Sequence, residues 1–253
     1  MNTKRTIVTS SIMTSHKFIG LKIALLWLNF SSVLGCAPSL ISIDRSEFDQ
    51  LQHQPVIHVV HYLSPSPIAM TPSTDVGGAL GGVLGGLTAV AMGKAAGEEL
   101  KKQCSLEDPS IGAREKVIDT LSREVGFKNF LLVPERLESD ELNILKSKFD
   151  NALLMDFKTH HWTLAVKPWT RWTTSRYYLV YSIRARIIRS QDSKVIWLGY
   201  SHFDENESLS TSSTWDELTE NGCALLKAKS SQAANTTAQQ LADQLLGKTA
   251  LEK

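Results

Sequence analysis

The chain lacks the residue patterns that mark catalytic and metal centres. No serine stands in a Gly-x-Ser-x-Gly setting, and no set of cysteine, histidine and aspartate has the spacing of zinc ligands. His58 and His61 are three positions apart in an expected strand, so their side chains point to opposite faces of a sheet. His160 and His161 are adjacent, so their side chains would also point to opposite faces of a strand. We therefore expect no metal, no cofactor and no enzymatic activity.

An excess of charge of either sign is also missing. The 253 residues include 27 Lys and Arg against 26 Asp and Glu, and 42% are hydrophobic. Nucleic-acid surfaces carry clusters of basic residues, so this balance predicts no nucleic-acid partner. The hydrophobic share is ordinary for a globular protein, and a core can form without metal ions or disulfide bonds.

Residues 1–35 contain no acidic residue, and their apolar run is too short to cross a membrane. The run at 23–34 holds about a dozen residues, against roughly 20 for a spanning helix. A basic start, a short apolar run and a small residue before the cleavage point are typical of a signal peptide. Translation from Met13 would give a more ordinary basic region.

The apolar run ends in Val33-Leu34-Gly35-Cys36, which resembles the lipobox of bacterial lipoproteins. The resemblance implies cleavage before Cys36, a diacylglyceryl thioether on its sulfur and an acyl chain such as palmitate on its amine. Several chains together make a stable membrane anchor. Ala37 stands where an aspartate would retain the protein in the inner membrane, so the resemblance implies an outer-membrane anchor and a periplasmic domain. The alternative is an ordinary secretory signal followed by an unrelated cysteine.

Two cysteines, Cys104 and Cys223, remain if Cys36 is lipidated. An even number in an oxidising compartment favours a disulfide between them. The bond would close a loop of about 120 residues and stabilise the fold by ~4–5 kcal/mol in the chain-entropy model. The alternative is two separately buried thiols.

Downstream of the signal peptide at 1–35, the pattern predicts a tether at 36–54 and a single α+β domain at 55–253. We expect a mixed sheet with helices packed on it, a β-hairpin at 177–203 and a long C-terminal helical region. The other expected elements are strands at 55–62, 130–134 (short and buried) and 151–157, and helices at 109–125 and 139–149.

Capping residues mark the starts of two of these helices. Asp108 followed by Pro109 is an N-cap with proline in the first turn. Thr214 and Glu217 form a capping box at the start of the C-terminal helical region. Gly222 and the serine pair at 230–231 are places where this region can bend.

Within the domain, the segment 76–97 is rich in glycine and resembles the glycine-zipper stretches of some envelope lipoproteins. Its glycines recur every four residues, a spacing that lets helix backbones approach closely. Glycine also costs about 1 kcal/mol per residue against alanine in an aqueous helix. Three alternatives stay open: a flexible apolar loop, a helix packed on the domain or on a second copy, and a segment inserted in a membrane.

The segment 161–176 is expected to be a loop rich in tryptophan. It holds Trp162, Trp169 and Trp172, with Arg171 beside the last of these. Tryptophan and arginine dominate binding hot spots, so these four residues are the candidate partner-binding surface. The alternative is that the tryptophans cap the open end of the sheet.

The hairpin carries a further resemblance. Residues 184–197, RARIIRSQDSKVIW, are similar to the hairpin of the domain shared by curli-secretion and penicillin-binding-protein-activator lipoproteins. The likeness extends at the level of pattern over roughly 140 residues, and it implies a mixed sheet without settling the activity.

Two functions fit these observations. The first is a lipid-anchored, non-catalytic envelope lipoprotein that acts as a binding or scaffold module for another envelope protein or for itself. The alternative is an oligomeric pore or secretion-channel component that uses the glycine-rich segment.

Overall fold

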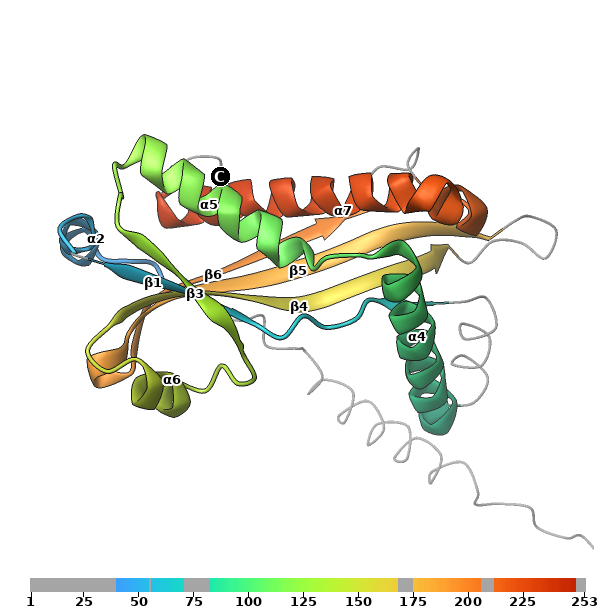
Figure 1. Ribbon diagram of the computed structural model, residues 1–253, viewed down its shortest axis with the longest axis horizontal. Coiled ribbons are helices and arrows are strands. Elements are labelled where there is room, and N and C mark those ends of the chain that lie inside the picture. The colour runs from blue at the N-terminus through green and yellow to red at the C-terminus, as the bar shows by residue number, and fades with distance from the viewer. Residues whose placement is uncertain (1–39, 55, 71–81, 168–174, 206–211, 249–253) are drawn as a thin grey trace, which may run out of the picture. The chain divides into compact units, whose positions relative to one another are not determined.

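A mixed sheet forms the centre of the domain (Figure 1). The computed structural model describes residues 40–54, 56–70, 82–167, 175–205 and 212–248, which lie in a compact unit that begins at Leu40. Its strands are β1 (Ile57–Tyr62), β2 (Ile68–Ala69), β3 (Phe130–Leu137), β4 (Leu153–Lys167), β5 (Arg176–Arg189) and β6 (Lys194–Asp204). The order is β3-β1-β4-β5-β6, and β2 also pairs with β4.

Both strand directions occur in the sheet, which confirms the predicted α+β class. β1 runs parallel to its neighbours β3 and β4, whereas β4, β5 and β6 are antiparallel. β5 and β6 form the predicted hairpin and are joined by the 3-10 turn Ser190–Asp192. Ser193 follows this turn with φ 57°, a left-handed conformation that reverses the chain.

Helices cover both faces of the sheet. They are α2 (Arg45–Gln52), α4 (Gly82–Cys104), α5 (Pro109–Glu124), α6 (Leu142–Lys148) and α7 (Trp215–Leu245). In Figure 1, α5 and α7 lie side by side on one face, α6 lies on the other, and α4 extends away from the sheet on the side of α6.

Two hydrophobic cores result. The larger one lies between the sheet and the α5–α7 pair and contains Phe157, Tyr181 and Trp197, all fully buried. The smaller one includes Leu145 of α6 and Leu154 of β4. Side chains of a strand alternate between the two cores, as the period of two requires.

The predicted capping residues start their helices. Asp108 accepts a hydrogen bond from the Ser110 amide at 2.8 Å. Thr214 accepts one from the Glu217 amide at 3.2 Å, and the Glu217 carboxylate accepts one from the Thr214 amide at 2.8 Å. α7 bends around Gly222, where residues 220–223 leave the helical conformation, and continues as a helix through 230–231.

The predicted tether at 36–54 is wrong for its second half. Residues 45–52 form α2, whose N-cap Asp44 accepts a hydrogen bond from the Ser46 amide at 2.7 Å. Phe48 and Leu51 are one turn apart and both enter the larger core. A helix of two turns has too few apolar positions to stand out as a periodic pattern.

The predicted loop at 161–176 is also wrong in its first part, because β4 continues to Lys167 and pairs with β5 as far as Arg176. The expected buried strand at 130–134 is instead part of an edge strand, β3, on which Leu131 and Leu132 are about half exposed (51% and 50%).

Of the three alternatives for the glycine-rich segment, the structure shows a helix that begins at Gly82 and packs on the domain from Gly93 onward. Gly93 and Gly97 face the main chain around β2. A Cβ atom on Gly97 would lie 1.6 Å from the Pro67 carbonyl oxygen. Only glycine allows this close approach of α4 to the chain before β2.

We expect Gly97→Ala to lower the free energy of unfolding by about 1–3 kcal/mol, because the methyl group forces the two backbones apart. The matched control is Gly112→Ala in α5, where a Cβ would make an ordinary 3.5 Å contact with Ala234. That change should raise the free energy of unfolding by about 0.5–1 kcal/mol, because alanine has a higher helix propensity than glycine. Urea unfolding measures both, and equal effects of the two substitutions would contradict the packing of α4 on β2.

Candidate functional site

Trp162 does not belong to a binding surface. It is 3% exposed and lies in the larger core together with Leu164. The register between β4 and β5 shifts between Thr159 and His161, and this bulge changes which residues face inward. The predicted role of Trp162 in partner binding is therefore wrong. Trp169, Arg171 and Trp172 lie outside the described residues, as does Cys36.

A different apolar surface is exposed on α4. Residues 87–92, here called the α4 arm, include Leu87, Val90 and Met92, which are 65%, 43% and 57% exposed. These positions lie on different sides of the helix, since a turn takes 3.6 residues. The arm carries no charge, and the first charged residue after it is Lys94. Apolar surface of this kind marks sites of interaction.

The C-terminal half of α4 fixes the arm to the domain. Leu100 is buried in the larger core, and Ala96 packs against that core. The Lys101 ammonium donates to the carbonyl oxygens of Ser64 and Pro65 at 3.3 and 3.2 Å. The arm thus precedes the part of α4 that packing and hydrogen bonds anchor to the domain.

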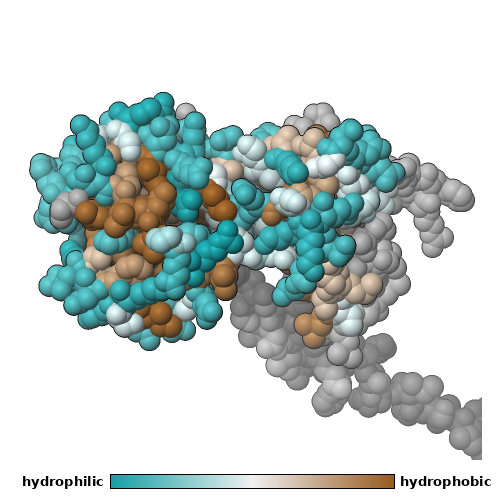
Figure 2. Space-filling model, viewed as in Figure 1, coloured by the Kyte–Doolittle hydropathy of each residue, from teal (hydrophilic) through white to brown (hydrophobic). Residues whose placement is uncertain are grey.

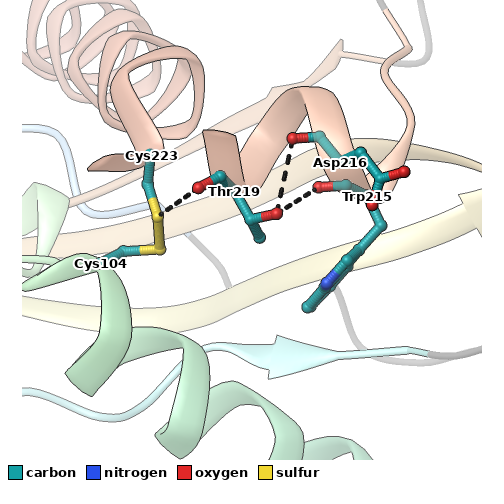
Figure 3. Close-up of a disulfide and its surroundings, with 5 residues drawn as sticks. All are labelled: Cys104, Trp215, Asp216, Thr219 and Cys223. Atoms are coloured by element: carbon teal, nitrogen blue, oxygen red, sulfur yellow. Dashed lines mark hydrogen bonds between the residues drawn. A yellow bond between two sulfur atoms is a disulfide. The ribbon is translucent and has the colours of Figure 1, made fainter. Parts of the chain in front are cut away.

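A disulfide joins the last residue of α4, Cys104, to Cys223 at the bend of α7 (Figure 3). The two Cα atoms are 5.4 Å apart, and both cysteines are buried. Asn221, Gly222 and Cys223 all have positive φ, so the bend turns Cys223 toward α4. Thr219, whose hydroxyl donates to the Trp215 carbonyl at 3.0 Å, closes the helical turn before the bend.

The edge strand β3 provides a second apolar surface. Figure 2 shows hydrophobic residues gathered over β3, between α5 and α6. The exposed apolar side chains in this part of the fold include Leu131 and Leu132 of β3, Val56 just before β1 and Ile144 of α6. An edge strand also presents main-chain groups that can pair with a further strand.

A buried ion pair lies on β4 and β5, next to the segment that leads into α6. Asp156 of β4 is fully buried, and the Arg186 guanidinium donates to its two carboxylate oxygens from Nε at 3.2 and 3.0 Å. The Tyr62 hydroxyl donates to the same carboxylate at 2.6 Å. Burial and the Asp156 charge raise the pKa of Tyr62, so it stays a donor at physiological pH.

Asp140 extends this network to the surface. Burial raises the pKa of Asp140, but hydrogen bonds from Lys158 and Arg184 outweigh that effect and lower it to about 2. Its carboxylate oxygens lie 2.7 Å from the Lys158 ammonium and 2.7 Å from the Arg184 guanidinium. Asp140 therefore holds the segment before α6 against β4 and β5 at neutral pH.

Among the described residues, no group of three or more His, Cys, Asp and Glu is placed to hold a metal ion. His160 contacts the edge of Tyr200, with ring centroids 6.0 Å apart, and His58 lies 6.1 Å from Phe149. No helix in the described ranges has both the length and the apolar character needed to cross a membrane.

No family model and no curated protein matches the chain in sequence. The chain is similar to a solved structure of PelC from Paraburkholderia phytofirmans, described as a dodecamer, at 15% identity over 82% of this chain and 94% of that chain, with a TM-score of 0.32. It is also similar to a neuraminyllactose-binding hemagglutinin homologue from Helicobacter pylori, at 10% identity over 80% and 94% of the two chains and a TM-score of 0.28. A lipoprotein from Neisseria meningitidis matches at 16% identity over 62% and 88%, with a TM-score of 0.22.

We expect the double variant Cys104→Ala and Cys223→Ala to lose about 2–5 kcal/mol of unfolding free energy, because the unfolded chain regains a large loop. Urea unfolding of the oxidised protein, the reduced protein and the variant tests this. The reduced protein and the variant should unfold at the same lower urea concentration. A variant as stable as the oxidised protein would show that the bond contributes nothing to the fold.

Proposed function

We propose that this chain is a lipid-anchored envelope protein whose α+β domain is a non-catalytic binding or scaffold module. The lipobox-like residues that end in Cys36 support an anchor in the outer membrane. The disulfide between Cys104 and Cys223 supports an oxidising compartment such as the periplasm.

The observation that carries the binding role is the exposed apolar α4 arm. Leu87, Val90 and Met92 are exposed on α4, and they would bury apolar area against a partner. The disulfide and the close contact of Gly97 with Pro67 hold α4 on the domain in the absence of a partner. A pre-ordered arm loses less conformational entropy on binding than a loop that must first fold.

A non-catalytic role is supported by what the buried polar groups do. Asp156 is bonded to Arg186 and Tyr62, and the carboxylate of Glu205 contacts the ammonium of Lys229. Asp108 accepts from Thr159 and caps α5. These groups hold strands and helices together.

An oligomeric pore or secretion-channel component is the second candidate. The observation in its favour is the start of α4, where 82–93 has no charged residue and contains four glycines. Small residues let helices from several copies approach closely. In this alternative the arms pack against one another around an axis.

The anchor is tested with Cys36→Ser in the full-length protein expressed in a bacterial envelope. The wild type should incorporate labelled palmitate and sediment with outer membranes, because the thioether and amide chains hold it there. The variant should lose the label and leave the membrane fraction. A variant that still carries the label would contradict lipidation at Cys36.

The arm is tested with the double variant Leu87→Lys and Met92→Lys in full-length lipidated protein. Burying two such side chains is worth about 3 kcal/mol or more, so the contact should weaken roughly a hundredfold. Cross-linking within the envelope and the mass in detergent measure the loss. Leu225→Lys, an equivalent change at an exposed position of α7, should have no effect.

Equal cross-linking of wild type and the arm variant would contradict the binding role of α4. Conductance in a bilayer separates the two candidate functions. Discrete channels that disappear with the arm variant would establish the pore component, and a silent bilayer with lost cross-links would establish the binding module.

A further inference from the structure

Arg114 of α5 is a buried cation without an adequate counter-charge. Its side chain is 9% exposed, and its Nε is buried with no hydrogen-bond partner among the described residues. Its ion-pair partner is Glu115, with Nη2 and Oε1 3.6 Å apart, and the Glu115 side chain is 65% exposed. An exposed carboxylate at this distance contributes little against the cost of burying a guanidinium.

Arg186 provides a comparison within the same molecule. Its side chain is 10% exposed, almost the same as Arg114. Yet Arg186 donates to both carboxylate oxygens of the buried Asp156 and to the Asp140 carbonyl oxygen. Buried polar groups in folded proteins are normally satisfied in this way. The different surroundings of Arg114 therefore require an explanation of their own.

The side chains of His61 and Arg136 lie close enough to Arg114 to interact with it electrostatically. His61 of β1 pairs in register with Arg136 of β3, so the two side chains share the sheet face that α5 covers. The register shifts between Val59 and His61, and the bulge in β3 that this implies contains Pro134. Bulges re-aim side chains, and this one places Arg136 opposite His61. His61 Nδ1 is buried and, like Arg114 Nε, has no hydrogen-bond partner among the described residues.

The nearby carboxylate is already engaged. Asp108 accepts hydrogen bonds from the Ser110 amide at 2.8 Å and from the Thr159 hydroxyl at 2.5 Å. It holds the start of α5 on β4 and, in the part of the chain that the structure describes, forms no ion pair with either arginine. The cluster of His61, Arg114 and Arg136 thus keeps an excess of positive charge next to α5.

We propose that His61, Arg114 and Arg136 form a binding site for a phosphate group, free or carried by a lipid headgroup. Arginine presents a planar set of donors that suits phosphate oxygens, and several such donors around one anion make charge-assisted hydrogen bonds. Arg114 supplies the buried end of the site. Arg136 is exposed and supplies its entrance.

The electrostatics agree with this assignment. Burial lowers the pKa of His61, and the charges of Arg114 and Arg136 lower it further, against a smaller opposite effect of Asp108. Burial also lowers the pKa of Arg114, an effect that Glu115 opposes and Arg136 reinforces. A bound dianion would reverse the mutual repulsion of these groups.

The test is calorimetric titration of the purified full-length protein with inorganic phosphate in chloride buffer at constant ionic strength. Wild type should bind phosphate saturably. Arg136→Gln, a change at an exposed position that leaves the core intact, should weaken binding about tenfold, and Arg114→Met should abolish it. Arg123→Gln, on the same helix and 63% exposed, is the matched control and should bind like wild type.

A parallel titration with glycerol phosphate separates the two sources. Tighter binding of glycerol phosphate than of inorganic phosphate assigns the site to a lipid headgroup, and equal or weaker binding assigns it to free phosphate. Absence of saturable binding of either compound would overturn the proposal. So would binding that Arg136→Gln and Arg123→Gln weaken equally. Neither result bears on the lipid anchor or the α4 arm, because the site lies between α5 and the sheet.

Discussion

The bond between Cys104 and Cys223 connects the part of the chain that leaves the sheet to the part that covers it. α4 extends away from the sheet, and its last residue is bonded to Cys223 at the bend of α7. α7 in turn packs on β5, β6 and α5. Without this covalent link, the helix would depend on Leu100, the contact of Gly97 with Pro67, and two hydrogen bonds from Lys101. The bend at Gly222 and Cys223 gives the bond its geometry, and the bond in turn keeps the apolar arm in a fixed direction.

Bulges in β3 and β4 determine which side chains of these strands face the core and which face solvent. The bulge near His160 in β4 turns Trp162 into the core and leaves His160 against Tyr200. The bulge in β3 brings Arg136 beside His61. The bulge in β4 inserts one residue and so shifts the alternation of that strand, whereas the bulge in β3 inserts two residues and places Arg136 opposite His61.

Local signals in the sequence predicted much of this fold. Asp108 with Pro109, and Thr214 with Glu217, fixed the starts of α5 and α7, because a cap is determined by residues within one turn. The hairpin predicted at 177–203 corresponds to β5 and β6. The candidate site was predicted less well. Trp162 was assigned to a loop at 161–176, whereas β4 continues to Lys167 and its bulge, which leaves no local mark in the sequence, turns Trp162 inward. The exposure of Leu87 depends on contacts that α4 makes elsewhere. The pairing of Arg136 with His61 joins residues 75 apart in the chain, which no local pattern predicts.

Hydrogen–deuterium exchange of the oxidised and reduced full-length protein tests most directly whether the disulfide holds the arm in place. Amides of residues 96–104 should exchange slowly in the oxidised protein and roughly tenfold or more faster after reduction, while those of β4 and β5 keep their protection, because local opening needs less free energy than global unfolding. Unchanged exchange of 96–104 on reduction, or loss of protection throughout the sheet, would contradict the account.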